Sequence, residues 1–207
     1  ISHIIEPHHN LEIGQTIEGH LDWDRRYRHM KMHTAQHLVS AVAYELFDGV
    51  RTVGNQLRYD KSRIDFNPIN FDDEMLSNLV NETNNLIRKG AELNIKMMTR
   101  EEINEIMPPE RTNMNLIPPN VEELRVVIIG DNLDLCPCAG THVQNISEIG
   151  GIEFLNKKSK EIKLEISNAI PGQLLSIRAE LNLMAKAGCW NIFYGFETAV
   201  IDEHRQR

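Results

Sequence analysis

The chain has 207 residues, of which 41% are hydrophobic and 25% are charged, and its formal net charge is −8. This is the composition of an ordinary globular protein, and no apolar run approaches the roughly 20 residues that a membrane-spanning helix needs. The acidic balance argues against a general electrostatic attraction to nucleic acid, so an RNA partner would need a local basic patch.

The N-terminus and the cysteines indicate the compartment. Residues 1–6 lack the basic and apolar regions of a signal peptide. Three cysteines, two of them separated only by Pro137, make a poor disulfide framework and favour a reducing compartment and metal chemistry. We therefore expect a cytoplasmic protein with no membrane partner. Because the sequence begins at Ile1 rather than Met, we also expect further chain upstream.

The apolar pattern predicts an N-terminal β segment followed by a long helix. Residues 1–24 read as short strands separated by glycines. A helix is expected over residues 24–47, with Asp24 as its N-cap. His33 and His37 are four residues apart on this helix, so their side chains should project from one face.

The rest of the chain alternates between strand-like and helix-like segments. Acids in the first turn and a terminal Gly90 mark a second long helix, and a capping box at Thr99–Glu102 opens a short third one. The predicted segments are a hairpin at 50–66, the second helix at 70–89, strands at 93–97, 124–129 and 162–166, and an apolar helix from Pro171. The apolar stretch 174–201 is compatible with self-association.

Two short motifs carry the chemistry, His33-Thr34-Ala35-Gln36-His37 and Cys138-Ala139-Gly140-Thr141-His142. Either spacing alone is weak, but together they supply three imidazoles and one thiolate, a ligand set that suits zinc. We predict one Zn²⁺ per chain, bound by His33, His37, Cys138 and His142. Cys136 competes for the thiolate position, and the four-residue spacing between Cys138 and His142 favours Cys138.

Other polar groups belong to the same motifs or follow them closely. Four protein ligands normally close a structural zinc site, whereas catalysis needs an open position. The candidates for a substrate pocket are Gln36, Thr52, Gly140 and Thr141. Gly140 would let the backbone approach a ligand closely. For Gln36 the alternative interpretation is a solvated helix position, and for Thr52 it is ordinary sheet packing.

With both motifs placed, the sequence resembles the AlaX family of alanyl-tRNA editing proteins and the editing domain of alanyl-tRNA synthetase. The resemblance covers about residues 12–166 and depends mainly on the order of the two motifs and on the Cys-x-Gly-Thr-His pattern. The matching segments are Asp22–Tyr27, Met32–Leu38, Val126–Asp131, Cys138–Val143 and Glu148–Ile152. Editing domains of threonyl-tRNA synthetase share the ligand spacings but lack the Gly-Thr-His ending.

The resemblance implies an α+β fold, in which an editing domain with a mixed or antiparallel sheet packs with two long helices. It divides the chain into the end of an N-terminal β-barrel (1–24), a zinc-containing editing domain (25–168) and a helical C-terminal extension (169–207), a candidate element for a homodimer. It implies zinc-dependent hydrolysis, in trans, of tRNA(Ala) mischarged with serine or glycine. It also places Thr52 near the hydroxyl of the serine.

Basic residues could meet the tRNA in two places. Arg25, Arg26, Arg28 and Lys31 precede the histidine motif, and Lys157 and Lys158 lie in a shortened version of the family's Lys-rich segment. Basic residues in the first turns of a helix are disfavoured by the helix dipole. We therefore interpret the first cluster as phosphate-binding, with a solvated helix terminus as the alternative.

Two classes of function stay open from the sequence. The first is an enzyme, a trans-acting aminoacyl-tRNA deacylase. The second is a non-catalytic structural zinc domain that binds RNA or protein. A zinc hydrolase of another class is a weaker third hypothesis, because the His-Glu-x-x-His motif with its built-in base is absent.

Overall fold

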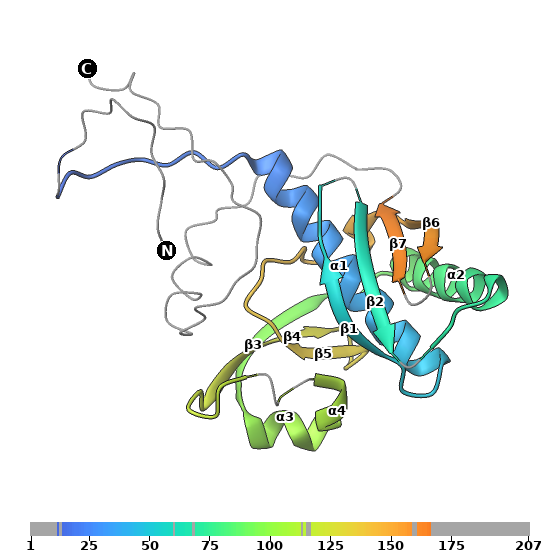
Figure 1. Cartoon of the computed structure of the whole chain (residues 1–207). Helices are drawn as coiled ribbons and strands as arrows, with labels where there is room; N and C mark the ends of the chain where they lie inside the picture. Colours follow the sequence, from blue (N-terminus) through green and yellow to red (C-terminus); the bar gives the residue numbers. More distant parts are fainter. Residues whose placement is uncertain are drawn as a thin grey trace.

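The computed structural model describes residues 12, 14–59, 61–67, 69–112, 114, 117–158 and 161–166. Within these residues the fold is α+β, as predicted, with two antiparallel sheets arranged around one long helix (Figure 1). The helix predicted from Pro171 and the apolar stretch 174–201 lie outside the described residues. None of the described helices is long and apolar enough to cross a membrane.

Helix α1, Trp23–Leu46, is the central element of the fold. Every residue from Met30 to Val39 is buried, including polar ones, because the helix is covered on all sides rather than along one stripe. It contacts α2, the 3₁₀ helix η2 and strands of both sheets. A residue on any face of its middle turns therefore points into the protein.

The start of α1 differs from the prediction. Asp22, not Asp24, is the N-cap, and its side chain accepts a hydrogen bond from the Arg25 backbone N–H at 3.0 Å. The strands expected in the preceding segment are absent from its described part, where residues 14–22 contain only an isolated bridge at His20. The assignment of residues 1–24 to the end of a barrel domain stays a prediction.

The first sheet has the strand order β1-β2-β7-β6 and packs with the two long helices. Its strands are β1 (Arg51–Gln56), β2 (Lys61–Asn67), β6 (Ile152–Lys158) and β7 (Glu161–Ile166). The hairpin of β1 and β2 and the second helix, α2 (Asp73–Lys89, capped by Asp72 and Gly90), are confirmed. Ile64 and Phe66 of β2 are fully buried between this sheet and α1.

The second sheet has the order β3-β4-β5 and its own small core. Its strands are β3 (Leu93–Thr99), β4 (Glu123–Ile129) and β5 (Asp134–Pro137), and the short helices are α3 (Arg100–Ile106), α4 (Pro109–Thr112) and η2 (Ile146–Ile149). The buried central strand and the Thr99 capping box are confirmed. Helix α4 and strand β5 were not predicted, and β5 is the element that leads into the cysteine motif.

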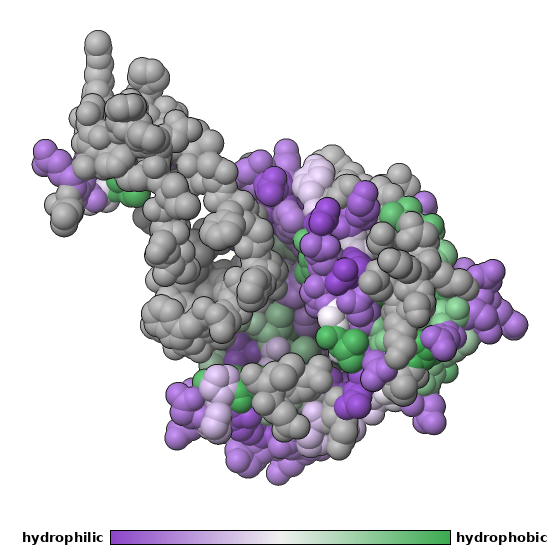
Figure 2. Space-filling view, in the orientation of Figure 1, coloured by the Kyte–Doolittle hydropathy of each residue, from purple (hydrophilic) through white to green (hydrophobic). Residues whose placement is uncertain are grey.

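The surface agrees with the acidic, polar composition. Figure 2 shows mainly hydrophilic side chains over the described part of this face, with small hydrophobic areas between them. Glu18 and Asp24 are among the exposed acids at the N-terminal end of the described chain. The side chains of the two motifs therefore face the interior of the fold, along α1 and next to β5.

The depth of α1 makes its apolar residues sensitive to truncation. We expect Leu38→Ala to lower the free energy of unfolding by about 2–5 kcal/mol, because Leu38 is 0% exposed in the main core and its loss leaves a cavity. Denaturant unfolding followed by circular dichroism measures the change. Leu46→Ala, an exposed position on the same helix, is the matched control and should cost about 0.5 kcal/mol or less. Equal losses in the two variants would contradict this packing.

Candidate metal centre and its pocket

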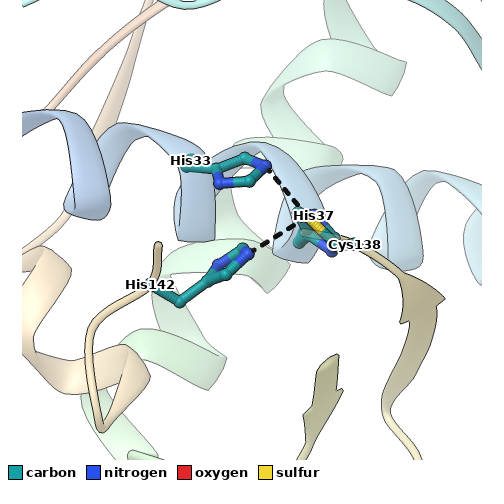
Figure 3. A group of neighbouring side chains, drawn as sticks. All are labelled: His33, His37, Cys138 and His142. Carbon is teal, nitrogen blue, oxygen red and sulfur yellow. Dashed lines mark hydrogen bonds between the residues drawn. The ribbon is translucent and has the colours of Figure 1, made fainter. Parts of the chain in front are cut away.

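The structure brings the two motifs together into one cluster. His33 and His37 lie one turn apart on α1, Cys138 follows β5, and His142 lies in the loop before η2. The four potential ligand atoms all lie within 4.8 Å of one another. Figure 3 shows the three imidazoles and the thiol converging from these separate elements. This cluster could hold a metal ion.

Hydrogen bonds to Nδ1 orient the rings of His33 and His37. His33 Nδ1 is 3.2 Å from the carbonyl oxygen of Thr141, and His37 Nδ1 is 2.9 Å from Asp134 Oδ2. A carbonyl and a carboxylate can only accept, so each Nδ1 carries the proton. The Nε2 atom of each ring is then the one that can offer its lone pair to a metal, once any proton on it is displaced.

The position of the proton on His142 follows in the same way, from its hydrogen bond with a hydroxyl group. The Thr34 hydroxyl donates to the Met30 carbonyl at 3.0 Å, and its oxygen lies 3.1 Å from His142 Nδ1. Because its proton is already used, the hydroxyl accepts from His142 and leaves Nε2 unprotonated. All three Nε2 atoms are therefore available to one metal centre, with Cys138 Sγ 3.6 Å from that of His33 and 3.5 Å from that of His142.

The thiol of Cys138 is the one suited to bind a metal. Burial raises its pKa, but the charge of His33 and hydrogen bonds with His142, His33 and His37 outweigh burial and hold it well below the usual value. The backbone N–H of Gly140 also donates to Cys138 Sγ at 3.4 Å. A thiolate is the form that ligates metals. These contacts support the choice of Cys138 over Cys136.

Cys136 has the opposite environment. Burial and the nearby Asp134 carboxylate raise the pKa of its thiol well above the usual value. Its Sγ contacts the carbonyl of Pro137 at 3.6 Å. It therefore stays a neutral thiol beside the cluster rather than joining it.

A metal ion would replace the positive charge that histidine protons place beside the Cys138 thiolate. Burial lowers the pKa of His37, but the hydrogen bond to Asp134 and the Cys138 thiolate together raise it to about 10. Burial and the charge of His33 lower the pKa of His142 well below its usual value. A divalent cation would take over the role of the His37 proton, and metal binding at such sites releases protons. The donor set and its protonation therefore fit a metal ion.

Arg125 holds the loop that carries the cysteine and was not predicted. Its side chain is buried, and its Nη1 donates to the carbonyls of Cys138 and Gly140. The sequence contains a signal for it, because a lone arginine inside the apolar strand Glu123–Ile129 needs a buried partner. The same contacts give Gly140 a structural role in the loop.

A pocket of about 330 Å³ opens beside the cluster, between α1, β1 and β5. Of the four predicted pocket residues, Gln36 and Thr52 line it, whereas Gly140 and Thr141 do not. Thr141 instead supplies the carbonyl that orients His33. Gln36 is buried rather than solvated, and Thr52 lies on the paired strand β1 at the pocket; their contact with a substrate stays a prediction.

A chain of polar side chains crosses this pocket wall from α1 to β1. Gln36 Nε2 donates to Ser40 Oγ at 2.9 Å, and Ser40 Oγ lies 2.6 Å from Thr52 Oγ1. Ser40 was missed from the sequence, although its position four residues after Gln36 places it on the same face of the helix. The two hydroxyls and the amide form a polar, hydrogen-bonded wall of the pocket beside the His–Cys cluster.

The predicted basic residues do not form one surface. Arg25 is exposed at the start of α1, and Arg28 Nε donates to the Tyr59 carbonyl at 3.0 Å. Lys31 is only 1% exposed, with its Nζ 4.7 Å from the centre of the Tyr27 ring, and burial lowers its pKa. Lys31 therefore does not lie on the surface with the arginines, because α1 is already enclosed at this turn.

The second predicted basic pair lies on the last hairpin. Lys157 and Lys158 belong to strand β6, next to β7. Their side chains lie outside what the structure describes. Their contact with tRNA stays a prediction.

Comparison with known proteins places these residues in a family. Residues 124–165 match the family model described as the threonyl and alanyl tRNA synthetase second additional domain. The chain is 35% identical over 163 residues to the alanyl-tRNA editing protein AlaX-M of Methanosarcina barkeri, and 37% identical over 161 residues to AlaX-M of Saccharolobus solfataricus. It is also 31% identical over 163 residues to the alanine–tRNA ligase of Metallosphaera sedula.

The alignments differ in how much of each protein they cover. Each AlaX-M alignment spans 77% of this chain and 66% of the relative, just under two thirds, while the ligase alignment spans 75% of this chain and 17% of the ligase. The residues that match the family model include the cysteine motif, Cys138–His142. The chain belongs to the family of AlaX-type alanyl-tRNA editing proteins.

Proposed function

We propose that this chain hydrolyses the aminoacyl ester of mischarged tRNA(Ala), in trans, with zinc at the His–Cys cluster. One observation carries the proposal: the potential ligands His33, His37 and Cys138 line the same pocket as the hydroxyls of Ser40 and Thr52. The family membership supports the substrate class. A cytoplasmic location and a homodimer through residues 174–201 remain predictions beside it.

Zinc is the metal that we propose for His33, His37, Cys138 and His142. Three imidazoles and one thiolate form a borderline-soft donor set, which favours zinc over magnesium or calcium. When bound, zinc would supply Lewis acidity at one side of the pocket. The residues of the chain supply selectivity and orientation at the other side.

The polar wall suits recognition of serine. Serine and alanine differ by one hydroxyl, and an apolar pocket separates such isosteres by only about a hundredfold. A pocket that hydrogen-bonds the hydroxyl rejects the analogue that lacks it, because its own polar groups would then lose a partner. Ser40 and Thr52 would share their hydrogen bond with the substrate hydroxyl, with Gln36 holding Ser40 in place. Glycine has no hydroxyl, so we favour serine as the substrate.

The hydrolysis itself needs a water and a leaving ribose oxygen. Water adds to the ester carbonyl, the bond from the acyl carbon to the ribose oxygen breaks, and the ribose oxygen takes up a proton. Asp134 is the carboxylate that lines the described pocket, and its two oxygens already face His37 and Arg111. We therefore propose no side-chain general base, and assign to the neighbouring ribose hydroxyl of the tRNA a part in moving the proton.

A structural role for the metal is the second candidate. Its basis is that four protein ligands within 4.8 Å would normally close a zinc site. It predicts a different outcome from the catalytic candidate: metal removal would unfold the chain, and no deacylation would be seen. Following circular dichroism and serine release together during chelation separates the two candidates.

The two cysteines provide a matched test of the metal centre. We expect Cys138→Ala to lose most of its bound zinc and at least about a hundredfold of its rate of serine release from Ser-tRNA(Ala), because the thiolate ligand is gone. Cys136→Ala should keep both, since its thiol stays neutral beside the cluster. Elemental analysis and a deacylation assay measure the two quantities. Full zinc content and activity in Cys138→Ala would rule out this centre.

The pocket wall can be tested with an isosteric change. Thr52→Val replaces the hydroxyl with a methyl group, and we expect kcat/KM for Ser-tRNA(Ala) to fall about 5- to 150-fold, the range that corresponds to about 1–3 kcal/mol for a hydrogen-bond partner left unsatisfied. Hydrolysis of Gly-tRNA(Ala) by the same variant is the internal control, because glycine makes no contact with the hydroxyl. A parallel fall for both substrates would show that Thr52 does not recognise the side chain.

The exposed start of α1 is our candidate contact for tRNA phosphates. We expect the double reversal Arg25→Glu and Arg26→Glu to weaken tRNA binding by tenfold or more at low salt and to flatten its salt dependence by about one unit of slope per lost contact. Filter binding across a salt series measures both. Arg88→Glu, at the exposed end of α2, is the control and should leave binding unchanged. Equal effects at the two positions would point to net charge alone.

A further inference from the structure

A buried chain of charges lies behind the ligand His37. Its Nδ1 donates to Asp134 Oδ2 at 2.9 Å, and the two side chains are only 6% and 9% exposed. Arg111 Nη2 lies 3.7 Å from the other carboxylate oxygen, Oδ1. Arg111 Nη1 in turn lies 3.5 Å from Glu45, whose side chain is 65% exposed. The charges therefore run from a ligand ring, through a buried ion pair, to the surface.

Arg111 is held by contacts on two other sides. Its Nη2 donates to the carbonyl of Leu133 at 2.9 Å, the residue directly before Asp134. Its guanidinium carbon lies 4.8 Å from the centre of the Tyr44 ring, on α1. The planar guanidinium thus joins α1, α4 and the start of β5, which are separate elements in the sequence. An arginine held on several sides in this way has little freedom left to lose.

We propose that Asp134 and Arg111 act as a pair of positioning residues that orient His37 and strengthen metal binding at the cluster. This inference deepens the proposed function, because it takes its metal centre as given. A carboxylate that accepts from Nδ1–H fixes the tautomer and the direction of the ring and makes Nε2 a better donor. Neither residue contacts the metal or the substrate in this role.

The arginine is required because the carboxylate is buried. A buried carboxylate without a cation beside it is costly, and it would be free to turn towards the metal itself. Arg111 offsets its charge from the side of Oδ1, at 3.7 Å, while Oδ2 accepts the hydrogen bond of His37. The corresponding partner of His142 is the neutral hydroxyl of Thr34. Of His37 and His142, only His37 therefore has a charged hydrogen-bond partner at its Nδ1 atom.

Metal titration tests the pair without using activity. Purified variants are stripped of metal and titrated with Co²⁺, whose thiolate charge-transfer and ligand-field bands report on the centre, and zinc affinity is measured by competition with a chromophoric chelator. We expect Asp134→Ala to raise the dissociation constant for zinc about 10- to 100-fold. Asp134→Asn keeps an oxygen acceptor and nearly the same volume, and it should recover part of that loss.

The Arg111 variant tests whether the two residues act together. Arg111→Gln should weaken zinc binding in the same direction as Asp134→Asn, and the double variant should lose no more than the larger single loss. Glu45→Gln is the matched control, since it removes the exposed end of the same charge chain and leaves the Asp134–His37 bond in place. It should bind zinc as the unchanged chain does.

The outcomes separate this inference from the proposed function. If Asp134→Asn and Arg111→Gln, folded by circular dichroism, bind zinc and show cobalt spectra like those of the unchanged chain, the pair does not position His37. Additive losses in the double variant would also overturn it. If the unchanged chain binds zinc, the variants weaken it as expected, and Ser-tRNA(Ala) is not hydrolysed, the positioning pair stands and the proposed function fails. Where Asp134→Ala does not fold, the Asp134→Asn result decides.

Discussion

The geometry of the His–Cys cluster depends on hydrogen bonds made by the Nδ1 atom of each histidine, on the side of the ring that faces away from the cluster. A backbone carbonyl, a carboxylate and a threonine hydroxyl each accept a hydrogen bond from an Nδ1–H group, so three Nε2 atoms point at one place. The partners come from the cysteine loop, β5 and α1. The ligand geometry is therefore a product of the whole fold, and the enclosed middle of α1 keeps it from relaxing.

The two sheets contribute different residues to the cluster and to the pocket beside α1. The second sheet, through β5 and the loop held by Arg125, supplies the thiolate and the anionic support for His37. The first sheet, through β1, supplies Thr52 and lines the opposite part of the pocket. In the proposed function, metal binding and substrate choice would thus depend on different elements, both of which contact α1.

The sequence predicted which four residues form the His–Cys cluster because their signal is local. Spacings of four residues on a helix and in a short motif need no knowledge of the tertiary structure. Asp134 had no such signal, since its partner His37 lies 97 positions away and the strand that carries it has only four residues. The choice between Asp22 and Asp24 as N-cap was also beyond the sequence, because both are good caps and only the backbone conformation decides. The basic residues show the same limit: nothing in the chain itself tells that Lys31 is enclosed while Arg25 is exposed.

Strand β1 lies at the edge of its sheet, where residues can change during evolution with little effect on the rest of the fold. An edge strand pairs on one side only, and the residues of β1 are exposed or half-buried, so replacing one disturbs little of the core. A replacement in the buried middle of α1 would instead disturb the His–Cys cluster or the core around it. New substrate preferences would therefore arise most readily by substitution along β1, while α1 and its histidines stay fixed by the needs of folding.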